Sequence, residues 1–356
     1  MRHTAFLVAG SLESRTGGSI YNRRMIEALR QRGWSVDVHE LGPDFPAPAP
    51  ETLARAAATL AATDDDTVVV VDGLAFGAMP DVVAAERTRL RLVPVVHMPL
   101  GDEAGLDAAT AEARSASEKR ALGAATFVVV TGSTTIGAVS AAGVVADRIV
   151  LVTPGTDRAP VARGSGGADL RLLCVAALTP GKGHDDLLRA LAASRHLGWR
   201  LTCVGSETRC PRTAEGVRAL VNELRLDDRV EFTGELEDAA LARQYDGADL
   251  FVLATLRETF GMAVAEAIAR AVPVVATRTG EIERIVGKGG CLPPVGNRFA
   301  FATALATVLA DAAFRAELRG GALAARDRLA DWDAAAVTMT AVLERGIDRL
   351  CRGDRE

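Results

Sequence analysis

The sequence predicts an α/β protein with two doubly wound parallel sheets. Short apolar runs alternate with helix-length amphipathic stretches along nearly the whole chain, and continuous apolar runs are typical of strands that helices bury on both faces. The alternation stops once, in a Pro- and Gly-rich stretch at 154–168, and then restarts. A length of 356 residues suits about two domains at roughly 100–200 residues each. We therefore expect two Rossmann-like domains that face each other across a cleft.

The first half supplies the strands and helices of one such domain. The helix predicted at 19–32 has Ser19 as a candidate N-cap, and Gly33 lies where it should stop. We expect strands at 5–9, 36–41, 68–72, 92–97, 127–131 and 149–153, and helices near 19–32, 51–62, 78–89, 107–122 and 133–142.

The second half repeats this layout after the linker. Residues from about 298 onward are Ala-rich and predicted to be helical. We expect strands at 170–177, 201–205, 230–233, 250–254 and 272–276. The predicted parts are an N-terminal domain at 1–157, a linker at 158–168, a C-terminal domain at 169–331 and a final helical segment at 332–356.

Composition excludes several classes of protein. With 49% apolar and 24% charged residues the chain is too apolar for disorder, and a net charge of −5 argues against a nucleic-acid partner. No apolar run approaches the ~20 residues of a membrane span, and the apolar start at 5–9 is too short for a signal peptide. The five cysteines show no metal-ligand spacing, which favours free thiols in a reducing cytoplasm. We expect a cytoplasmic protein. Its oligomeric state is not indicated.

The most informative stretch lies between 250 and 277. A strand ends near Ala254, a loop carries Glu258, and a helix begins near Gly261. That helix is apolar on every face except for Glu266, whose carboxylate needs hydrogen-bond donors if it is buried. Ligand hydroxyls would suit, although solvent or an internal Arg would also serve. The free N–H groups from Thr259 to Met262 make the helix start a candidate phosphate site.

Three further turns place polar groups at carboxyl ends of predicted strands, where ligands bind in such sheets. Lys182, one of only three lysines in the chain, follows the strand at 170–177 within the sequence P-G-K-G. Gly17 and Gly18 precede a helix and would let the backbone approach a ligand closely. His97 ends the strand at 92–97. Each turn taken alone also fits a purely structural role.

Together these stretches resemble the retaining glycosyltransferases of family 4, which have the GT-B fold. The most specific feature is Glu258 and Glu266, separated by seven residues in R-E-T-F-G-M-A-V-A-E and followed by P-V-V-A-T. The resemblance implies that Glu258 contacts the donor sugar and that Glu266 accepts hydrogen bonds from the nucleotide ribose. Backbone N–H groups of Phe260, Gly261 and Met262 would hold the diphosphate.

The resemblance extends less specifically to other positions. Lys182 would be the cation on the diphosphate, Gly17 and Gly18 would lie over donor and acceptor, and His97 would touch the donor sugar near the leaving group. The final helix would cross back onto the N-terminal domain. The loop that reads the base would include Thr233, Gly234 and Leu236, and the candidates for the acceptor site are Arg15, Tyr21 and Met98.

One position departs from the family pattern. The family has an Arg five residues before the lysine of the phosphate turn, and this chain has Ala177 there. A charge-assisted contact of that kind contributes ~1.5–3 kcal/mol. Arg15, Arg209 and Arg257 are candidates to replace it.

The expected function is that of a retaining, metal-independent hexosyltransferase with no cofactor. It would move a sugar from a nucleoside-diphosphate sugar, with UDP as the first candidate, to a soluble small molecule. Ala177 keeps a second hypothesis open, a pseudo-glycosyltransferase or nucleotide-sugar-binding protein with altered chemistry. A two-domain dehydrogenase or a periplasmic-type binding protein is more distant, because the G-x-G-x-x-G glycines and a signal peptide are both missing.

Overall fold

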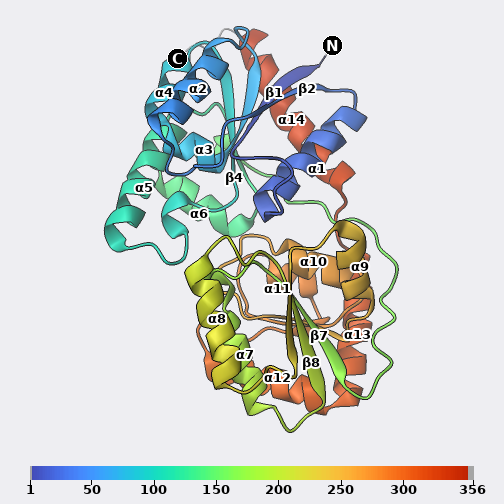
Figure 1. The fold of residues 1–356 in the computed structure, drawn as a ribbon. Helices are drawn as coiled ribbons and strands as arrows, with labels where there is room; N and C mark the ends of the chain where they lie inside the picture. The colour runs from blue at the N-terminus through green and yellow to red at the C-terminus, as the bar shows by residue number, and fades with distance from the viewer. Residues whose placement is uncertain (1, 352–356) are drawn as a thin grey trace. The chain divides into compact units, whose positions relative to one another are not determined.

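The computed structural model describes residues 2–351, which form two compact units. Unit 1 comprises the residues up to Gly155 and those from Ala330 onward, and unit 2 comprises Thr156–Leu329. The last helix therefore belongs with the N-terminal elements, and Figure 1 shows it in red beside the blue α1. Residues 352–356 of the predicted final segment lie outside the described residues.

Unit 1 is built on a six-stranded parallel sheet with the order β2-β1-β3-β4-β5-β6. The strands follow the predicted apolar runs to within two residues, because burial on both faces requires such runs. Their bounds are β1 His3–Val8, β2 Ser35–Glu40, β3 Val68–Asp72, β4 Arg91–Val96, β5 Val128–Val130 and β6 Ile149–Leu151.

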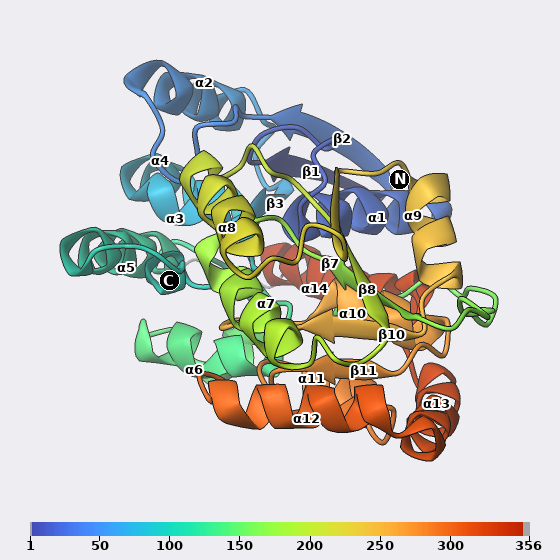
Figure 2. The ribbon, with the colours of Figure 1, turned by 60° about the horizontal axis from the view of Figure 1, so that its bottom comes forward.

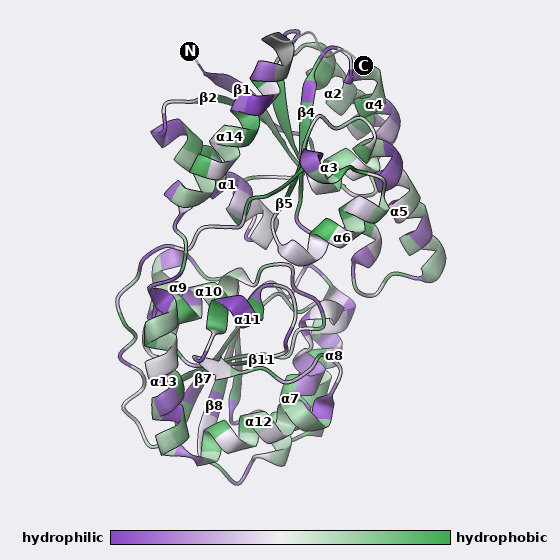
Figure 3. Cartoon of the chain, turned by 180° about the vertical axis from the view of Figure 1, so that it is seen from behind, coloured by the Kyte–Doolittle hydropathy of each residue, from purple (hydrophilic) through white to green (hydrophobic). Residues whose placement is uncertain are grey.

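Helices cover both faces of this sheet. α14 packs on α1 and β3, and α5 packs on α3 and α4. Figure 3 shows hydrophobic strands under helices of mixed hydropathy, as expected where each helix buries one stripe. The elements are α1 Gly17–Gln31, α2 Pro50–Ala61, α3 Gly73–Ala78, α4 Pro80–Glu86, η1 Leu100–Asp102, α5 Ala108–Leu122, α6 Ser133–Ala141, η2 Ala146–Arg148 and α14 Trp332–Cys351.

Unit 2 contains a second six-stranded parallel sheet, with the order β12-β11-β10-β7-β8-β9. The chain starts in the middle at β7, proceeds outward to β9, and then returns to β10 on the other side of β7. Successive strands are thus added on one side of β7 as far as β9 and on its other side from β10 onward, so the strand order reverses between β7 and β10. The bounds are β7 Leu170–Val175, β8 Trp199–Val204, β9 Val230–Gly234, β10 Leu250–Leu253, β11 Val274–Ala276 and β12 Gly290–Cys291.

The helices of unit 2 also form two layers. α12 packs on α7, which contacts α8, whereas α10 packs on α11 and α13 (Figure 2). The elements are η3 Pro180–Lys182, α7 His184–Ala193, α8 Pro211–Glu223, α9 Asp238–Asp246, α10 Met262–Ala269, α11 Ile282–Val286, α12 Arg298–Ala310 and α13 Ala312–Arg326.

Three local expectations were wrong or incomplete. The N-cap of α1 is Thr16, whose hydroxyl accepts the N–H of Ser19 at 2.8 Å, so Ser19 lies inside the helix. The helix expected at 78–89 is the shorter α4, and a separate helix that was not predicted, α3, precedes it; Met79 leaves the helical conformation between the two. The two-residue strand β12 was not predicted, since Gly290 and Cys291 form too short a run.

No single helix among the described residues is long and apolar enough to cross a membrane. α12 and α13 pass the length and composition test only as a pair, and that pair is bent by 102°.

Candidate functional site

Lys182 and Glu258 meet at the point where the strand order of the unit 2 sheet reverses, between β7 and β10. Lys182 follows β7 and Glu258 follows β10, and these two strands are neighbours. The Lys182 ammonium forms an ion pair with the Glu258 carboxylate, and the two side chains are 31% and 16% exposed. In open α/β sheets ligands bind outside the carboxyl ends of the strands at this reversal. The structure thus joins two of the predicted site residues where a ligand is expected.

Hydrogen bonds connect the loops after β7, β10 and β11. The Thr255 hydroxyl and the Leu256 N–H both donate to the Gly181 carbonyl, at 3.0 and 2.8 Å. The Thr277 hydroxyl donates to the Thr255 carbonyl. Because Thr255 and Thr277 are buried, these bonds are shielded from water. Lys182 and Glu258 are therefore held by one hydrogen-bonded group of loops.

Two glycines allow these loops to approach each other. Gly183 has φ +66°, and a Cβ there would lie 2.0 Å from the Ala254 carbonyl oxygen. Gly280 has φ +54°, and a Cβ there would lie 2.2 Å from the Glu258 carbonyl oxygen. Any side chain at either position would push apart the loops that carry the ion pair.

The start of α10 presents backbone N–H groups that the helix itself does not pair, and they follow Glu258 closely in the chain. Gly261 caps the helix with φ +97° and provides no side-chain hydrogen bond. The first bond inside the helix runs from the Ala265 N–H to the Gly261 carbonyl at 3.0 Å. The N–H groups of Met262 and the next two residues consequently have no acceptor within the helix. Thr259 is half-buried and Phe260 is buried, so the residues before Met262 also frame this end. Such a helix end attracts an anion.

Glu266 lies in the second turn of α10 and is half-buried. Burial raises the pKa of its carboxyl group, while the Tyr245 hydroxyl and the Arg270 guanidinium act in the opposite direction. The guanidinium lies over the Tyr245 ring at 4.8 Å, and Tyr245 also donates to the Ala263 carbonyl at 3.0 Å. A carboxylate can accept about four hydrogen bonds, so Glu266 keeps acceptor capacity for further donors.

The last residues of β9, the loop that follows them and the Ala177 position complete this edge of unit 2. The Thr233 hydroxyl donates to its neighbour, the Gly234 carbonyl, at 3.0 Å, and Leu236 packs against the core. Arg209 lies 3.9 Å from Glu235 of the same loop. The methyl side chain of Ala177 carries no charge and cannot serve as the cation expected at this position. Arg257, the residue before Glu258, is exposed.

A second group of predicted residues meets in unit 1. Gly18, at the start of α1, lies so close to His97 that a Cβ would be 3.3 Å from the imidazole Cδ2. Burial lowers the pKa of His97, although the Asp72 carboxylate opposes the shift. The His97 Nε2 atom is buried and has no hydrogen-bond partner among the described residues. The lowered pKa favours the neutral imidazole, and His97 thus presents a nitrogen without a described partner beside a glycine turn.

Tyr21 does not fit the acceptor role predicted for it. Its side chain is fully buried, and its hydroxyl donates to the Val152 carbonyl at 3.3 Å. The ring packs edge-on against His97 and Trp332, with centroids 5.0 and 5.7 Å away. Tyr21 thus supports His97 from the core and leaves no surface for an acceptor.

The remaining predicted residues of unit 1 lie near the same turn. Gly17 is exposed at the start of α1, and Arg15 is half-buried in the loop before it. Met98 directly follows His97 and is half-buried. These residues belong to unit 1, whereas Lys182 and Glu258 belong to unit 2.

Two polar residues near His97 were not predicted from the sequence. Asp72, at the end of β3, accepts the Asn22 amide at 2.6 Å and the Leu74 N–H at 2.9 Å. Both Asp72 and Asn22 are buried. The available signal was that Asp72 is the polar residue that ends an otherwise all-valine run. The strand-end argument used for His97 would have identified it.

Comparison with known proteins relates unit 2 to one enzyme family. Residues 169–311 match the protein family described as "Glycosyl transferases group 1". The D-inositol 3-phosphate glycosyltransferase of Xylanimonas cellulosilytica is 34% identical over 172 residues, which cover 47% of this chain and 40% of that protein. The mannosylfructose-phosphate synthase of Agrobacterium fabrum is 35% identical over 124 residues, 33% of this chain and 27% of that protein. The match thus spans about half or less of these relatives' length.

Solved structures match the chain over almost its whole length. The sucrose-phosphate synthase of Thermosynechococcus elongatus has a TM-score of 0.80 at 23% identity and covers 96% of this chain and 98% of its own. Anabaena HepE in complex with UDP-glucose has a TM-score of 0.77 at 18% identity, covering 96% of this chain and 100% of its own. These likenesses confirm the predicted GT-B fold.

Proposed function

We propose that this chain is a retaining, metal-independent glycosyltransferase, because its residues 169–311 match the family of group 1 glycosyl transferases. Its donor is a nucleoside-diphosphate sugar, and its acceptor is a soluble small molecule. One observation carries the proposal. Lys182, Glu258 and the first N–H groups of α10 come together where the strand order of unit 2 reverses.

This arrangement suits the departure of a nucleoside diphosphate. Negative charge grows on the phosphate oxygen as the bond to the anomeric carbon breaks. The Lys182 ammonium and the start of α10 provide fixed positive potential for that charge. Once the donor is bound, these groups do not have to reorganise during the reaction, and they therefore stabilise the transition state more effectively than water does. The chain's own groups thus supply the charge stabilisation that a divalent cation gives in other enzymes.

The other site residues bind and orient the substrates. Glu266 accepts the ribose hydroxyls, and Glu258 contacts the donor sugar after its ammonium partner turns toward the diphosphate. The Nε2 atom of His97, which has no described hydrogen-bond partner, contacts the donor sugar near the leaving group. The acceptor attacks the same face of the anomeric carbon from which the diphosphate departs.

UDP-glucose is our first candidate for the donor. Support comes from HepE, whose structure was determined with that compound. Three of the matched proteins are named for phosphorylated compounds. These compounds are inositol 3-phosphate, mannosylfructose phosphate and sucrose phosphate. We therefore propose a phosphorylated polyol or sugar as the first acceptor class to screen.

The test is thermal stabilisation by a panel of nucleotides in the presence of EDTA. UDP, GDP, ADP, TDP and NAD are compared on the wild type, Lys182→Ala and Glu266→Ala, with Lys288→Ala as the matched control because Lys288 is exposed on a turn of the same unit. A ligand at ~100 times its Kd adds ~2.7 kcal/mol. We expect one nucleoside diphosphate to stabilise the wild type and the Lys288→Ala variant and to stabilise the other two variants markedly less. Stabilisation by NAD alone, or by none of the five, would refute the donor site.

A second candidate function keeps the nucleotide site but changes the chemistry. Ala177 stands where the family has a cation. A protein that binds the nucleotide but transfers no sugar would show stabilisation without release of nucleoside diphosphate. Measuring that release from UDP-glucose, with inositol 3-phosphate and fructose 6-phosphate as acceptors, separates the two functions.

A further inference from the structure

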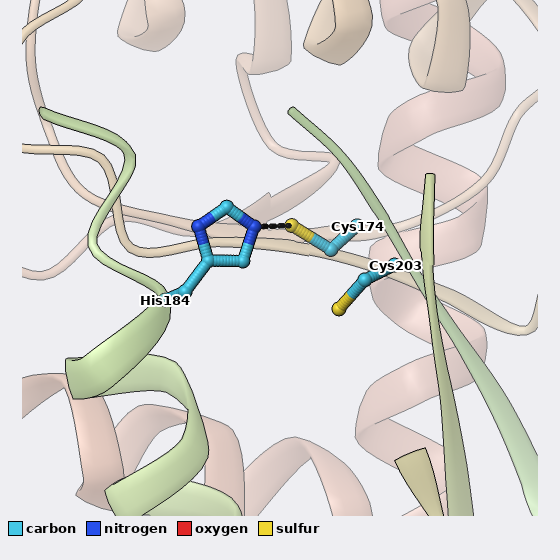
Figure 4. Close-up of side chains that lie close together, drawn as sticks. All are labelled: Cys174, His184 and Cys203. Carbon is cyan, nitrogen blue, oxygen red and sulfur yellow. Dashed lines mark hydrogen bonds between the residues drawn. The ribbon is translucent and has the colours of Figure 1, made fainter. Parts of the chain in front are cut away.

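Cys174, His184 and Cys203 converge in the interior of unit 2. Cys174 of β7 and Cys203 of β8 are register partners in the parallel sheet, so their side chains leave the same face. His184 is the first residue of α7, the helix that follows the Lys182 turn. Figure 4 shows its imidazole pointing toward both sulfur atoms. The three residues are 1%, 3% and 1% exposed in chain order.

The distances are close to those of a metal site. The Cys174 Sγ and His184 Nε2 atoms are 3.9 Å apart, and all three candidate ligand atoms lie within 4.8 Å of one another. Zinc–sulfur bonds of ~2.3 Å and zinc–nitrogen bonds of ~2.0 Å place tetrahedral ligand atoms about 3.5–3.8 Å apart. A small rotation of the side chains is therefore sufficient to bring all three onto one ion.

The chemistry of the donor set selects a soft ion. Two sulfur atoms and one imidazole nitrogen suit Zn²⁺, Cd²⁺ and Cu⁺, whereas Mg²⁺ and Ca²⁺ prefer oxygen. Within residues 2–351 the cluster contains no carboxylate. A hydrogen bond from the Cys203 thiol, aided by the His184 imidazole and the Lys182 ammonium, lowers the pKa of Cys174 and favours its thiolate. The His184 Nδ1 atom is buried without a described hydrogen-bond partner.

We propose that Cys174, His184 and Cys203 bind one thiophilic metal ion of the Zn²⁺ class in the core of unit 2. Binding releases the thiol protons of Cys174 and Cys203 to solvent and leaves two thiolates and a neutral imidazole as ligands. The ion links β7, β8 and α7, and so fixes both sides of the turn that carries Lys182. It takes no part in sugar transfer, and the site is independent of the proposed function.

The first experiment titrates the reduced, metal-free full chain with Cd²⁺. Formation of Cd–thiolate bonds is followed by their ultraviolet charge-transfer absorption, and Zn²⁺ is then added as a competitor. We expect saturation at one equivalent, displacement by Zn²⁺, and affinity at least tenfold lower in Cys174→Ala and in His184→Gln. Cys291→Ala is the matched control, because Cys291 is a free thiol of the same unit outside the cluster, and it should bind like the wild type.

Native mass spectrometry of the wild type keeps the proposal testable if a core variant fails to fold. One zinc adduct per chain, with loss of thiol protons, supports the site. The absence of any adduct at micromolar Zn²⁺ overturns it, as does equal binding by a folded Cys174→Ala variant. Recovery of Cys174 and Cys203 only as a disulfide-linked peptide pair that binds no metal after reduction also overturns it. None of these outcomes depends on a nucleotide binding or a sugar being transferred.

Discussion

Replacing Lys182 by Ala separates the role of its ammonium in folding from its role in binding. In the free protein the ammonium is paired with Glu258 and remains 31% exposed, so solvent screens the pair. A pair of this kind stabilises the fold by about 0–1 kcal/mol. For a unit of this size that corresponds to a Tm decrease of at most about 4 °C. The variant should therefore fold.

The expected loss appears on binding the diphosphate. The ammonium would exchange a carboxylate for phosphate oxygens, and a charge-assisted hydrogen bond contributes ~1.5–3 kcal/mol. Without it, Glu258 also faces the diphosphate with its charge uncompensated. We expect Lys182→Ala to weaken binding of the nucleoside diphosphate by ~10–150-fold. Isothermal titration calorimetry measures the two dissociation constants directly.

A double-mutant cycle isolates the contribution of Glu258. If the uncompensated Glu258 carboxylate adds repulsion, the variant with both Lys182→Ala and Glu258→Gln binds the diphosphate more tightly than Lys182→Ala alone. Lys288→Ala again serves as the control for loss of one positive charge. A Kd for Lys182→Ala within twofold of the wild type, in a folded protein, would refute the assignment of the ammonium to the diphosphate.

Three further substitutions test particular contacts. Gly183→Ala should destabilise the chain by more than ~1 kcal/mol in urea unfolding, because the φ of Gly183 is positive and another atom occupies the place of its Cβ. The control Gly216→Ala, at an open position inside α8, should be neutral or stabilise by up to ~1 kcal/mol. Equal effects of the two substitutions would contradict the close approach of the loops at Gly183. Burial raises the pKa of Glu118 from 4.5 to about 7, so its contribution to stability is present below pH 4.5 and is lost as the pH rises toward 7, on the order of 3 kcal/mol. Unfolding at pH 5 and pH 8 should show this loss in the wild type and in the exposed control Glu112→Gln, but not in Glu118→Gln. Thr16→Ala removes the N-cap of α1 and should cost ~0.5–2 kcal/mol, measured by thermal unfolding; an unchanged Tm would show that the cap contributes nothing.

The sequence predicted the strands well because a strand buried on both faces must be a continuous apolar run. It also predicted which loops carry the site, because parallel strands bring their carboxyl ends to one edge. Lys182 and Glu258 are 76 positions apart and were assigned to the same ligand only through a family resemblance. Their contact follows from the neighbouring positions of β7 and β10, which no local pattern encodes.

The less predictable features depend on pairing between distant segments. Spacing along the chain gave no indication that Cys174 and Cys203 are opposite each other, since register is set by the whole sheet. The burial of Tyr21 depends on Trp332, more than 300 positions later. Short β12 and the break at Met79 lie below the length at which periodicity is informative.

The assignment of α14 to unit 1 has a consequence for the order in which the protein folds during synthesis. Domains fold as units while the chain leaves the ribosome, at about 5–20 residues per second. Unit 2 is continuous from Thr156 to Leu329 and can complete its core as soon as it has emerged. Unit 1 has to wait for α14, and until then the face of α1 that α14 covers remains open to chaperones and to other chains. The N-terminal part of this protein is thus made first and finished last.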